Sequence, residues 1–359
     1  MRHIKLGLVV LMTEILVACG GGGSDIPATP KFASQVSFGD SLSDVGTYKV
    51  GTVALLKGGQ FSINGTSPIN WTELTAAKLG LAAPCPALTG LDGDPLQGFS
   101  VMPPVTHAGC TGYAQGGARV TNPVGVGNKL LGGSNATIGM LTIPIVTQIQ
   151  NHLSANGGTF KGNELVLVMA GANDVFIQAA SIGQGLPLAS GVAAMQLAAT
   201  QLATAVSTQI VANGAKYVVV MNVPDISSTP QVTSIADPVV KAQTAGMMTA
   251  LVQAFNTQLK TSLPDSANVL NVDAYAASQD EVQNPGKYLL TNVTNTACNL
   301  TAPNPNPLAS SLVCNALNLN TGVLPTDHYL FADNVHPTPY GHSLFSLYVL
   351  QAMTNKGWY

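Results

Sequence analysis

Two short segments near opposite ends of the chain carry the residue types of a nucleophile and its base. The first, Gly39 to Leu42, places Ser41 directly after a run typical of a buried strand. Such a serine can lie at the edge of a sheet with its backbone N–H free, but its hydroxyl attacks only when a base accepts its proton. The second segment places Asp333 three residues before His336. One turn at this offset lets the carboxylate accept the imidazole Nδ1 proton and leaves Nε2 facing the serine, which predicts a catalytic triad for acyl transfer.

The remaining histidines are weaker candidates for the base. Apart from His336, only His328 has a carboxylate at a suitable position, because it directly follows Asp327. The side chains of adjacent residues usually diverge, so this pair is less suited to form a hydrogen bond. Each segment also fits a structural interpretation: a polar turn that caps a helix around Ser41, and a surface turn before the last helix around His336.

Two further segments could supply hydrogen-bond donors to the oxyanion of an acyl-transfer intermediate. In Ala170 to Asp174, the side-chain amide of Asn173 is a candidate donor. In Tyr113 to Ala118, the doublet Gly116-Gly117 lets the backbone approach a ligand closely and present an N–H group. A glycine doublet alone is a weak signal, so this prediction depends on the presence of the other candidate segments in the same chain.

The elements that must position these residues alternate between short β-branched runs and longer helical stretches, a pattern typical of a parallel sheet covered by helices. The predicted strands are 34–38, 165–169, 216–222 and 268–273, with a weaker one between Val105 and Ala114. The predicted helices are 71–79, 143–155, 190–212, 238–262 and 339–355. Sheets of this type bind ligands beyond the carboxyl ends of their strands, where the candidate residues are expected.

These elements predict a single α/β domain over residues 32–359. Within it, the stretch 276–331 is rich in Asn, Pro and Thr and contains two cysteines, so it is interpreted as an insertion held by its own disulfide. Loops after the strands contain apolar residues, including Met102, Val105 and Phe176, that could line a pocket for an acyl chain.

The composition excludes several classes of protein. The chain has 359 residues, of which 46% are hydrophobic and 9% charged, with a net charge of −3. Disordered chains combine low hydrophobicity with high net charge, and nucleic-acid binding requires a basic surface, so neither is expected. The uncharged stretch 175–215 has apolar residues on one helical side only, which predicts an amphipathic helix and not a membrane span. Clustered His and C-x-x-C are missing from the sequence, so no metal and no cofactor is expected.

The N-terminus has the pattern of an export signal. Basic Arg2 and Lys5 precede an apolar run that ends in Leu16-Val17-Ala18-Cys19, which resembles a bacterial lipobox. We therefore expect residues 1–18 to be a signal peptide, Cys19 to be lipidated, and residues 19–31 to be a flexible tether. An ordinary secretory signal is the alternative. The mature protein is expected to be a monomer, attached through Cys19 to the bacterial outer membrane or secreted.

The other four cysteines agree with export, because disulfides persist in oxidising compartments. Four cysteines allow three connectivities. We favour pairs of nearest neighbours, Cys85 with Cys110 and Cys298 with Cys314.

Taken together, the four candidate segments resemble the conserved blocks of the GDSL lipases and esterases, the SGNH hydrolase family. The blocks are Gly39-Asp40-Ser41-Leu42, Gly116-Gly117-Ala118, Gly171-Ala172-Asn173-Asp174 and Asp333-Asn334-Val335-His336, and they occur in the order of the family. The segment Phe61 to Gly65, followed by Trp71, is also similar to the family's stretch after the nucleophile block. The resemblance extends from about Phe32 to the end of the chain.

The resemblance implies a fold and a role for each residue. The fold is a flavodoxin-like, three-layer α/β/α sandwich with a central parallel sheet of about five strands. Ser41 is the nucleophile, His336 its base, and Asp333 the residue that orients His336. The Ser41 N–H, the Gly117 N–H and the Asn173 side chain form the oxyanion hole, with Gly117 preferred over Gly116.

The expected activity is hydrolysis of carboxylic esters of the lipase or esterase type, with a small-molecule or lipid ester as substrate. An acyltransferase or phospholipase on the same scaffold is an alternative, because an alcohol can resolve the acyl-enzyme as well as water can. A surface lipoprotein that binds ligands without catalysis is another. This non-catalytic alternative is disfavoured because a binding protein has no need of Ser41, Asn173, Asp333 and His336 together.

Overall fold

A central sheet of four parallel strands forms the middle of the protein, in the order β1-β4-β5-β6. The computed structural model describes residues 31–301 and 306–359, so the predicted signal peptide and Cys19 lie outside the described residues. The strands are β1 (Ser34–Gly39), β4 (Glu164–Met169), β5 (Tyr217–Met221) and β6 (Val269–Val272). Each coincides with a predicted strand, because strands buried on both faces read as continuous apolar runs.

The predicted fifth strand, between Val105 and Ala114, does not form. Next to β1 the chain makes a single parallel bridge between Ser37 and Gly112. Gly112 packs so closely against its neighbours that a Cβ atom would lie 2.9 Å from the Cys85 carbonyl oxygen. Val105 instead belongs to β3 (Val101–Thr106), which pairs antiparallel with β2 (Leu88–Asp92) in a hairpin outside the central sheet.

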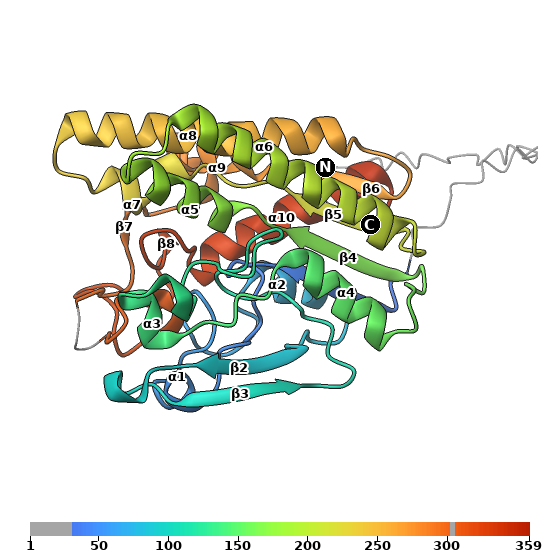
Figure 1. Cartoon of the computed structure of the whole chain (residues 1–359), viewed down its shortest axis with the longest axis horizontal. Coiled ribbons are helices and arrows are strands. Elements are labelled where there is room, and N and C mark those ends of the chain that lie inside the picture. The colour runs from blue at the N-terminus through green and yellow to red at the C-terminus, as the bar shows by residue number, and fades with distance from the viewer. Residues whose placement is uncertain (1–30, 302–305) are drawn as a thin grey trace, which may run out of the picture.

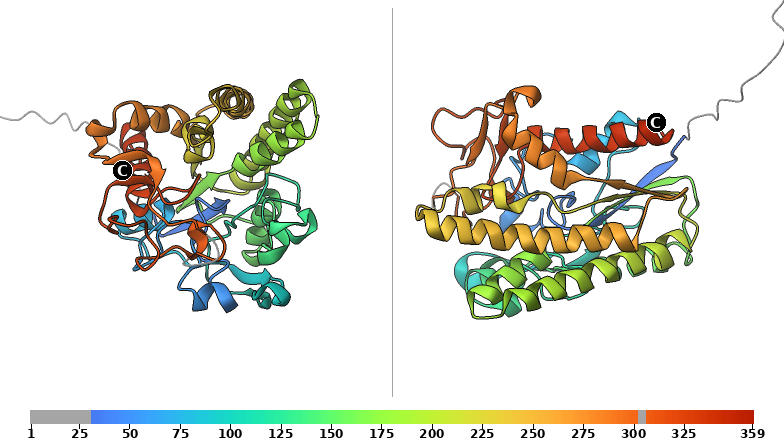
Figure 2. Two further views of the ribbon diagram at one scale, coloured as in Figure 1. Left: turned by 90° about the vertical axis from the view of Figure 1, so that its left-hand side faces the viewer. Right: turned by 90° about the horizontal axis from the view of Figure 1, so that it is seen from above.

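Helices cover both faces of the sheet, which gives three layers. The helices are α1 (Gly51–Leu55), α2 (Trp71–Lys78), α3 (Ser134–Ile138), α4 (Ile145–Ala155), α5 (Ala172–Gly183), α6 (Leu188–Ala205), α7 (Pro230–Thr233), α8 (Pro238–Ser262), α9 (Ala274–Gln283) and α10 (Pro339–Lys356). Figure 2 shows α6 and α8 on one side of the strands and α10 on the other. The predicted helix 190–212 is α6 with a π-helical end, Val206–Val211. The predicted α/β/α class is confirmed, with four strands in the sheet.

Alternating side chains of the strands build one hydrophobic core on each face. Val166 and Val168 face the core that contains α6 and α8, whereas Leu165 and Leu167 face the core of α2 and α10. Trp71 is fully buried in this second core. Burial of each such side chain contributes about 1.5–3 kcal/mol, so the two cores fix the strand ends where the candidate residues lie.

The predicted insertion lies at the carboxyl ends of the strands. In Figure 1 its orange and red loops are on the left, the side to which β4 points. It contains β7 (Asn292–Thr296) and β8 (Tyr329–Phe331), which pair in parallel. Both predicted disulfides form, Cys85–Cys110 and Cys298–Cys314. Within the described ranges, no helix is long and apolar enough to cross a membrane.

Candidate active site

The turn that carries Ser41 is fixed at the end of β1. The Gln148 side chain accepts from the Gly39 N–H and donates to the Gly39 carbonyl oxygen, both at 2.9 Å. A Cβ at Gly39 would lie 2.6 Å from the Met169 carbonyl oxygen, so β1 and β4 can approach closely only with glycine here. The Asp40 carboxylate accepts the Leu42 N–H at 3.1 Å, and burial raises the pKa of Asp40 to about 7. These contacts leave the Ser41 side chain at the end of the strand.

The structure brings the predicted serine, histidine and aspartate into one hydrogen-bonded chain. His336 Nε2 lies 2.9 Å from Ser41 Oγ. His336 Nδ1 lies 2.9 Å from both carboxylate oxygens of Asp333. Ser41 and His336 are 295 residues apart in sequence, and only the fold brings them together. In this arrangement Nδ1 carries the proton that bonds Asp333, and Nε2 can accept the serine proton.

The Asp333 carboxylate is buried but well supplied with donors. The backbone N–H groups of Val335 and His336 donate to Oδ1, and that of Ser311 donates to Oδ2 at 2.8 Å. Burial alone would raise the pKa of Asp333, but the charge of His336 and these hydrogen bonds outweigh it and hold the pKa well below its usual range. Asp333 is therefore an anion at neutral pH, as a residue that orients an imidazole must be.

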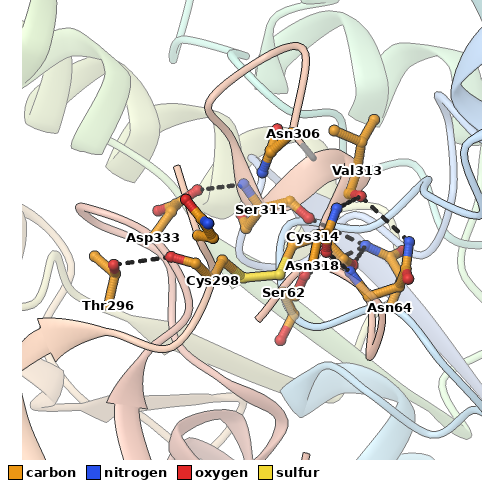
Figure 3. The surroundings of a disulfide bond; sticks show 12 residues. Ser62, Asn64, Thr296, Cys298, Asn306, Ser311, Val313, Cys314, Asn318 and Asp333 are labelled. Atoms are coloured by element: carbon orange, nitrogen blue, oxygen red, sulfur yellow. Dashed lines mark hydrogen bonds between the residues drawn. A yellow bond between two sulfur atoms is a disulfide. The ribbon is translucent and has the colours of Figure 1, made fainter. Parts of the chain in front are cut away.

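The donor Ser311 lies close to the Cys298–Cys314 disulfide, as Figure 3 shows. Ser311 lies in the loop that this disulfide closes, and its N–H reaches Asp333 from there. The amide of Asn64 donates to the carbonyl oxygens of Ser311 and Cys314 at 3.1 and 3.0 Å. The segment 61–65, identified from its similarity to the family, thus holds the loop that carries a partner of Asp333.

The two glycines of the doublet differ in whether their backbone N–H groups are hydrogen-bonded. The Gly116 N–H donates to Asp44 Oδ2 at 2.9 Å and is therefore occupied. For Gly117 and Ser41, the described residues provide no acceptor to the backbone N–H. Gly117 has a φ of +79°, and a Cβ there would lie 1.9 Å from the Val126 carbonyl oxygen, so only glycine fits. The geometry favours Gly117 over Gly116 as a donor to a ligand.

Asn173 joins this glycine segment to the end of β4. It is the second residue of α5, and its amide nitrogen donates to the Ala118 carbonyl oxygen at 3.0 Å. The next residue, Asp174, accepts from Arg119 Nε at 2.9 Å and from the Val120 N–H at 3.0 Å. One amide hydrogen of Asn173 is thus used to hold the side chain, and the other is free to contact a ligand.

Asp44 is a residue of this region that the sequence analysis missed. Its carboxylate accepts from the N–H groups of Gly46, Thr47 and Gly116, and burial raises its pKa to about 6. It thereby links the turn after Ser41 to the glycine segment. The local sequence could have indicated an Asx turn at Asp44, but not the contact with Gly116, which is 72 residues away.

Three other histidines of the described residues, His152, His328 and His342, are placed in structural roles. The His328 ring stacks on Tyr340 with 3.8 Å between centroids, and its Nδ1 lies 2.8 Å from the Leu289 carbonyl oxygen. Burial lowers the pKa of His152 to about 4 and that of His342 to about 3, so both stay neutral. Among the residues that the structure describes, no group of three or more His, Cys, Asp or Glu could hold a metal ion.

A narrow, largely apolar pocket opens beside Ser41 and His336. Phe176 lines it as expected, but Met102 and Val105 do not, because they belong to the β2–β3 hairpin. The apolar lining residues are Leu42, Ala172, Phe176, Pro224, Ile226, Val282, Leu330, Phe331, Val335, Pro337 and Phe345. Four of them, Pro224, Ile226, Val282 and Phe345, lie in segments that were not connected with the site from the sequence. The buried residue Glu281 also lines the pocket.

We expect Glu281 to make the stability of the fold fall as the pH rises. Burial raises its pKa from 4.5 to about 7, so between these values the folded chain binds more protons than the unfolded chain. The contribution of this group is fully present below pH 4.5 and is lost as the pH rises through about 7. One pKa unit corresponds to about 1.4 kcal/mol, which gives a loss on the order of 3 kcal/mol.

The measurement is urea unfolding of the wild type and of Glu281→Gln at about pH 5 and about pH 8. Other titrating groups are common to both proteins and cancel in the difference. The wild type should lose stability relative to Glu281→Gln at the higher pH, whereas parallel profiles would show that the Glu281 carboxyl ionises normally.

Comparison with known proteins supplies a family match and distant structural neighbours. The protein-family model described as GDSL-like Lipase/Acylhydrolase matches residues 36–349. No curated protein matches the chain at a significant level.

Similar solved structures include an extracellular lipase from Streptomyces rimosus, with 13% identity, a TM-score of 0.46, and coverage of 89% of this chain and 99% of that one. A phospholipase A1 from Streptomyces albidoflavus has 14% identity and a TM-score of 0.40, covering 90% of this chain and 99% of that one. An aryl esterase from M. smegmatis has 15% identity and a TM-score of 0.37, covering 91% of this chain and 100% of that one.

Proposed function

Because the chain belongs to the GDSL-like lipase/acylhydrolase family, we propose that it hydrolyses carboxylic esters through an acyl-enzyme on Ser41. The observation that carries this proposal is the unbroken hydrogen-bonded chain from Ser41 Oγ through His336 to Asp333. A serine hydroxyl is a weak nucleophile by itself, and this arrangement supplies the base and its orienting carboxylate.

The proposed reaction proceeds in two halves. Ser41 Oγ attacks the ester carbonyl carbon while His336 Nε2 accepts the hydroxyl proton. The tetrahedral intermediate collapses, the bond to the alcohol oxygen breaks, and His336 returns the proton to the departing alcohol. Water then gives a proton to His336 and attacks the acyl carbon. The bond from this carbon to Ser41 Oγ breaks, His336 returns the proton to Ser41 Oγ, and the carboxylic acid is released. Throughout, the Asp333 anion holds Nδ1 and stabilises the imidazolium.

The oxyanion of each tetrahedral intermediate would be stabilised by the N–H groups of Ser41 and Gly117 and by the Asn173 amide. The two backbone N–H groups lack acceptors among the described residues. Asn173 is held by Ala118, so its orientation is set before substrate binds. Donors that are oriented in advance stabilise charge in the transition state without reorganisation.

Replacing Asn173 with alanine should lower kcat by about 10²- to 10³-fold and leave KM nearly unchanged. The amide acts on an oxygen that becomes negative only in the transition state, so ground-state binding does not depend on it. Steady-state kinetics of Asn173→Ala checks this, with Asn151→Ala on the exposed face of α4 as control. If Asn173→Ala instead raises KM at constant kcat, the Asn173 side chain contributes to substrate binding and not to stabilisation of the oxyanion.

The pocket beside Ser41 and His336 would hold the hydrocarbon part of the ester. Its lining is largely apolar, so an alkyl or aryl substituent gains from burial there. The direct experiment is hydrolysis of p-nitrophenyl esters with acyl chains of two to sixteen carbons by the purified full chain. Turnover with a chain-length optimum supports the proposal, and no turnover of any ester by folded protein would reject it.

We also propose that the protein is exported and held at the membrane through lipidated Cys19. The two disulfides support export, because such bonds are rare in the cytosol. Cys19→Ser should move the protein from the membrane pellet to the soluble fraction when it is expressed in a bacterial host that processes lipoproteins. Retention of the variant in the pellet would exclude lipid attachment at this residue.

A further inference from the structure

Most polar groups around the pocket are engaged with the protein itself. The Ser228 and Thr229 hydroxyls donate to backbone carbonyl oxygens, and the Ser278 hydroxyl donates to one while it accepts the Asp225 N–H. The Asp225 carboxylate accepts from Ser227 on one oxygen and from Gln279 on the other. These groups maintain the loop and α9 and have little capacity left for a ligand.

Glu281 differs from them. It projects from α9, is 1% exposed, and lines the same pocket as Ser41 and His336. Its Oε1 accepts the Tyr348 hydroxyl at 2.8 Å. In the described part of the chain, no other side chain or backbone group forms a hydrogen bond with the Glu281 carboxyl. A carboxyl group offers up to four acceptor sites, or one O–H donor and acceptors when protonated, so most of this capacity is unused.

Burial determines the form that this carboxyl takes. It raises the pKa of Glu281 to about 7, so a large share of the molecules carry a proton there at neutral pH. A protonated carboxyl can donate a hydrogen bond as well as accept one. A purely hydrocarbon ligand in the pocket would cover this group without pairing it, which is unfavourable. A ligand with an oxygen at the level of Glu281 would satisfy it.

Resting on the ester hydrolysis proposed above, we propose that Glu281 determines specificity, and that the preferred ester has a chain with a hydroxyl or oxo oxygen placed to bond the Glu281 carboxyl. The scissile ester lies at Ser41 and the chain occupies the apolar pocket. The chain oxygen either donates to or accepts from Glu281. Sites that pair a substrate hydroxyl discriminate strongly against the analogue that lacks it, because the site is then left unpaired.

The test compares matched pairs of esters that differ by one hydroxyl. In the first series, p-nitrophenyl esters carry acyl chains either unsubstituted or hydroxylated at successive carbons. In the second, acetate esters carry alcohols that differ in the same way. The two series show whether the acyl or the alcohol part occupies the pocket. The full chain is assayed as wild type, Glu281→Leu, Glu281→Gln and Val282→Ala, with thermal unfolding as a check of folding.

We expect the wild type to favour one hydroxylated ester over its unsubstituted partner by roughly tenfold to a hundredfold in kcat/KM. Glu281→Leu should reverse this ratio, by improving turnover of the unsubstituted ester and impairing the hydroxylated one. Glu281→Gln keeps a donor and an acceptor, so it should retain a preference. Val282→Ala removes apolar contact in the same pocket and should change both esters of a pair alike.

Other results would overturn the inference. A wild type with no preference for any hydroxylated ester in either series refutes it without need of a variant, and so does a folded Glu281→Leu with an unchanged ratio. Failure of the proposed function looks different, because the wild type would then turn over neither member of any pair. Ester hydrolysis without a hydroxyl preference removes only the role of Glu281.

Discussion

Ser41→Ala should abolish ester hydrolysis, with a fall in kcat of about 10⁶-fold. The methyl group of alanine cannot form an acyl-enzyme, so the hydrogen-bonded chain that ends at Ser41 Oγ loses its reacting atom. The residual rate would come from the oxyanion donors and from binding alone. The measurement is steady-state turnover of the best p-nitrophenyl ester at high enzyme concentration.

Two controls make this result specific. Ser207→Ala changes an exposed serine remote from the site and should leave turnover unchanged. Thermal unfolding of Ser41→Ala should match the wild type, because within residues 31–301 and 306–359 Ser41 Oγ bonds the imidazole and no other group. Retention of even a tenth of the wild-type kcat by Ser41→Ala would show that another group is the nucleophile.

Asp333→Asn should lower kcat by about 10⁴-fold. An amide at this position can accept the Val335 and His336 N–H groups on its oxygen, but its NH₂ group then faces the Ser311 N–H and cannot accept from it. The imidazole also loses the anion that fixes its tautomer and stabilises its protonated form. Because Asp333 does not line the pocket beside Ser41, KM should change little.

The matched control is Asp327→Asn, which alters the other aspartate that lies close to a histidine in sequence. Asp327 accepts the Leu324 N–H on the surface, so its replacement should leave kcat within about twofold of the wild type. A large loss in Asp327→Asn together with a small one in Asp333→Asn would assign the base to His328.

The sheet and the triad were accessible from the sequence because their signals are local. Glu164–Met169 and Tyr217–Met221 are short, nearly continuous apolar runs, as strands buried on both faces require. The offset between Asp333 and His336 is equally local. This offset favoured Asp333 and His336 over the adjacent residues Asp327 and His328. In the structure, His336 bonds both Asp333 and Ser41.

The features that the sequence did not reveal depend on contacts between distant segments. In place of a strand, Gly112 forms single bridges to Ser37 and to Pro86, which are 75 and 26 residues away in sequence. Asp44 holds Gly116 across 72 residues, which no periodicity indicates. The pocket is built from loops and helices in several parts of the chain, and Glu281 occupies a position in α9 that reads as an ordinary surface glutamate. In the fold it is buried and bonds Tyr348 of α10.

The proposed role of Ser41 can be tested by covalent labelling of the wild-type chain with a fluorophosphonate, followed by mass spectrometry of the digested protein. This reagent reacts with serines that a neighbouring base activates, in the same way that an ester does. We expect one adduct per chain, on Ser41, formed in step with the loss of ester hydrolysis and missing from Ser41→Ala and Asp333→Asn. An adduct on another residue, or full loss of activity with Ser41 unlabelled, would show that Ser41 is not the nucleophile.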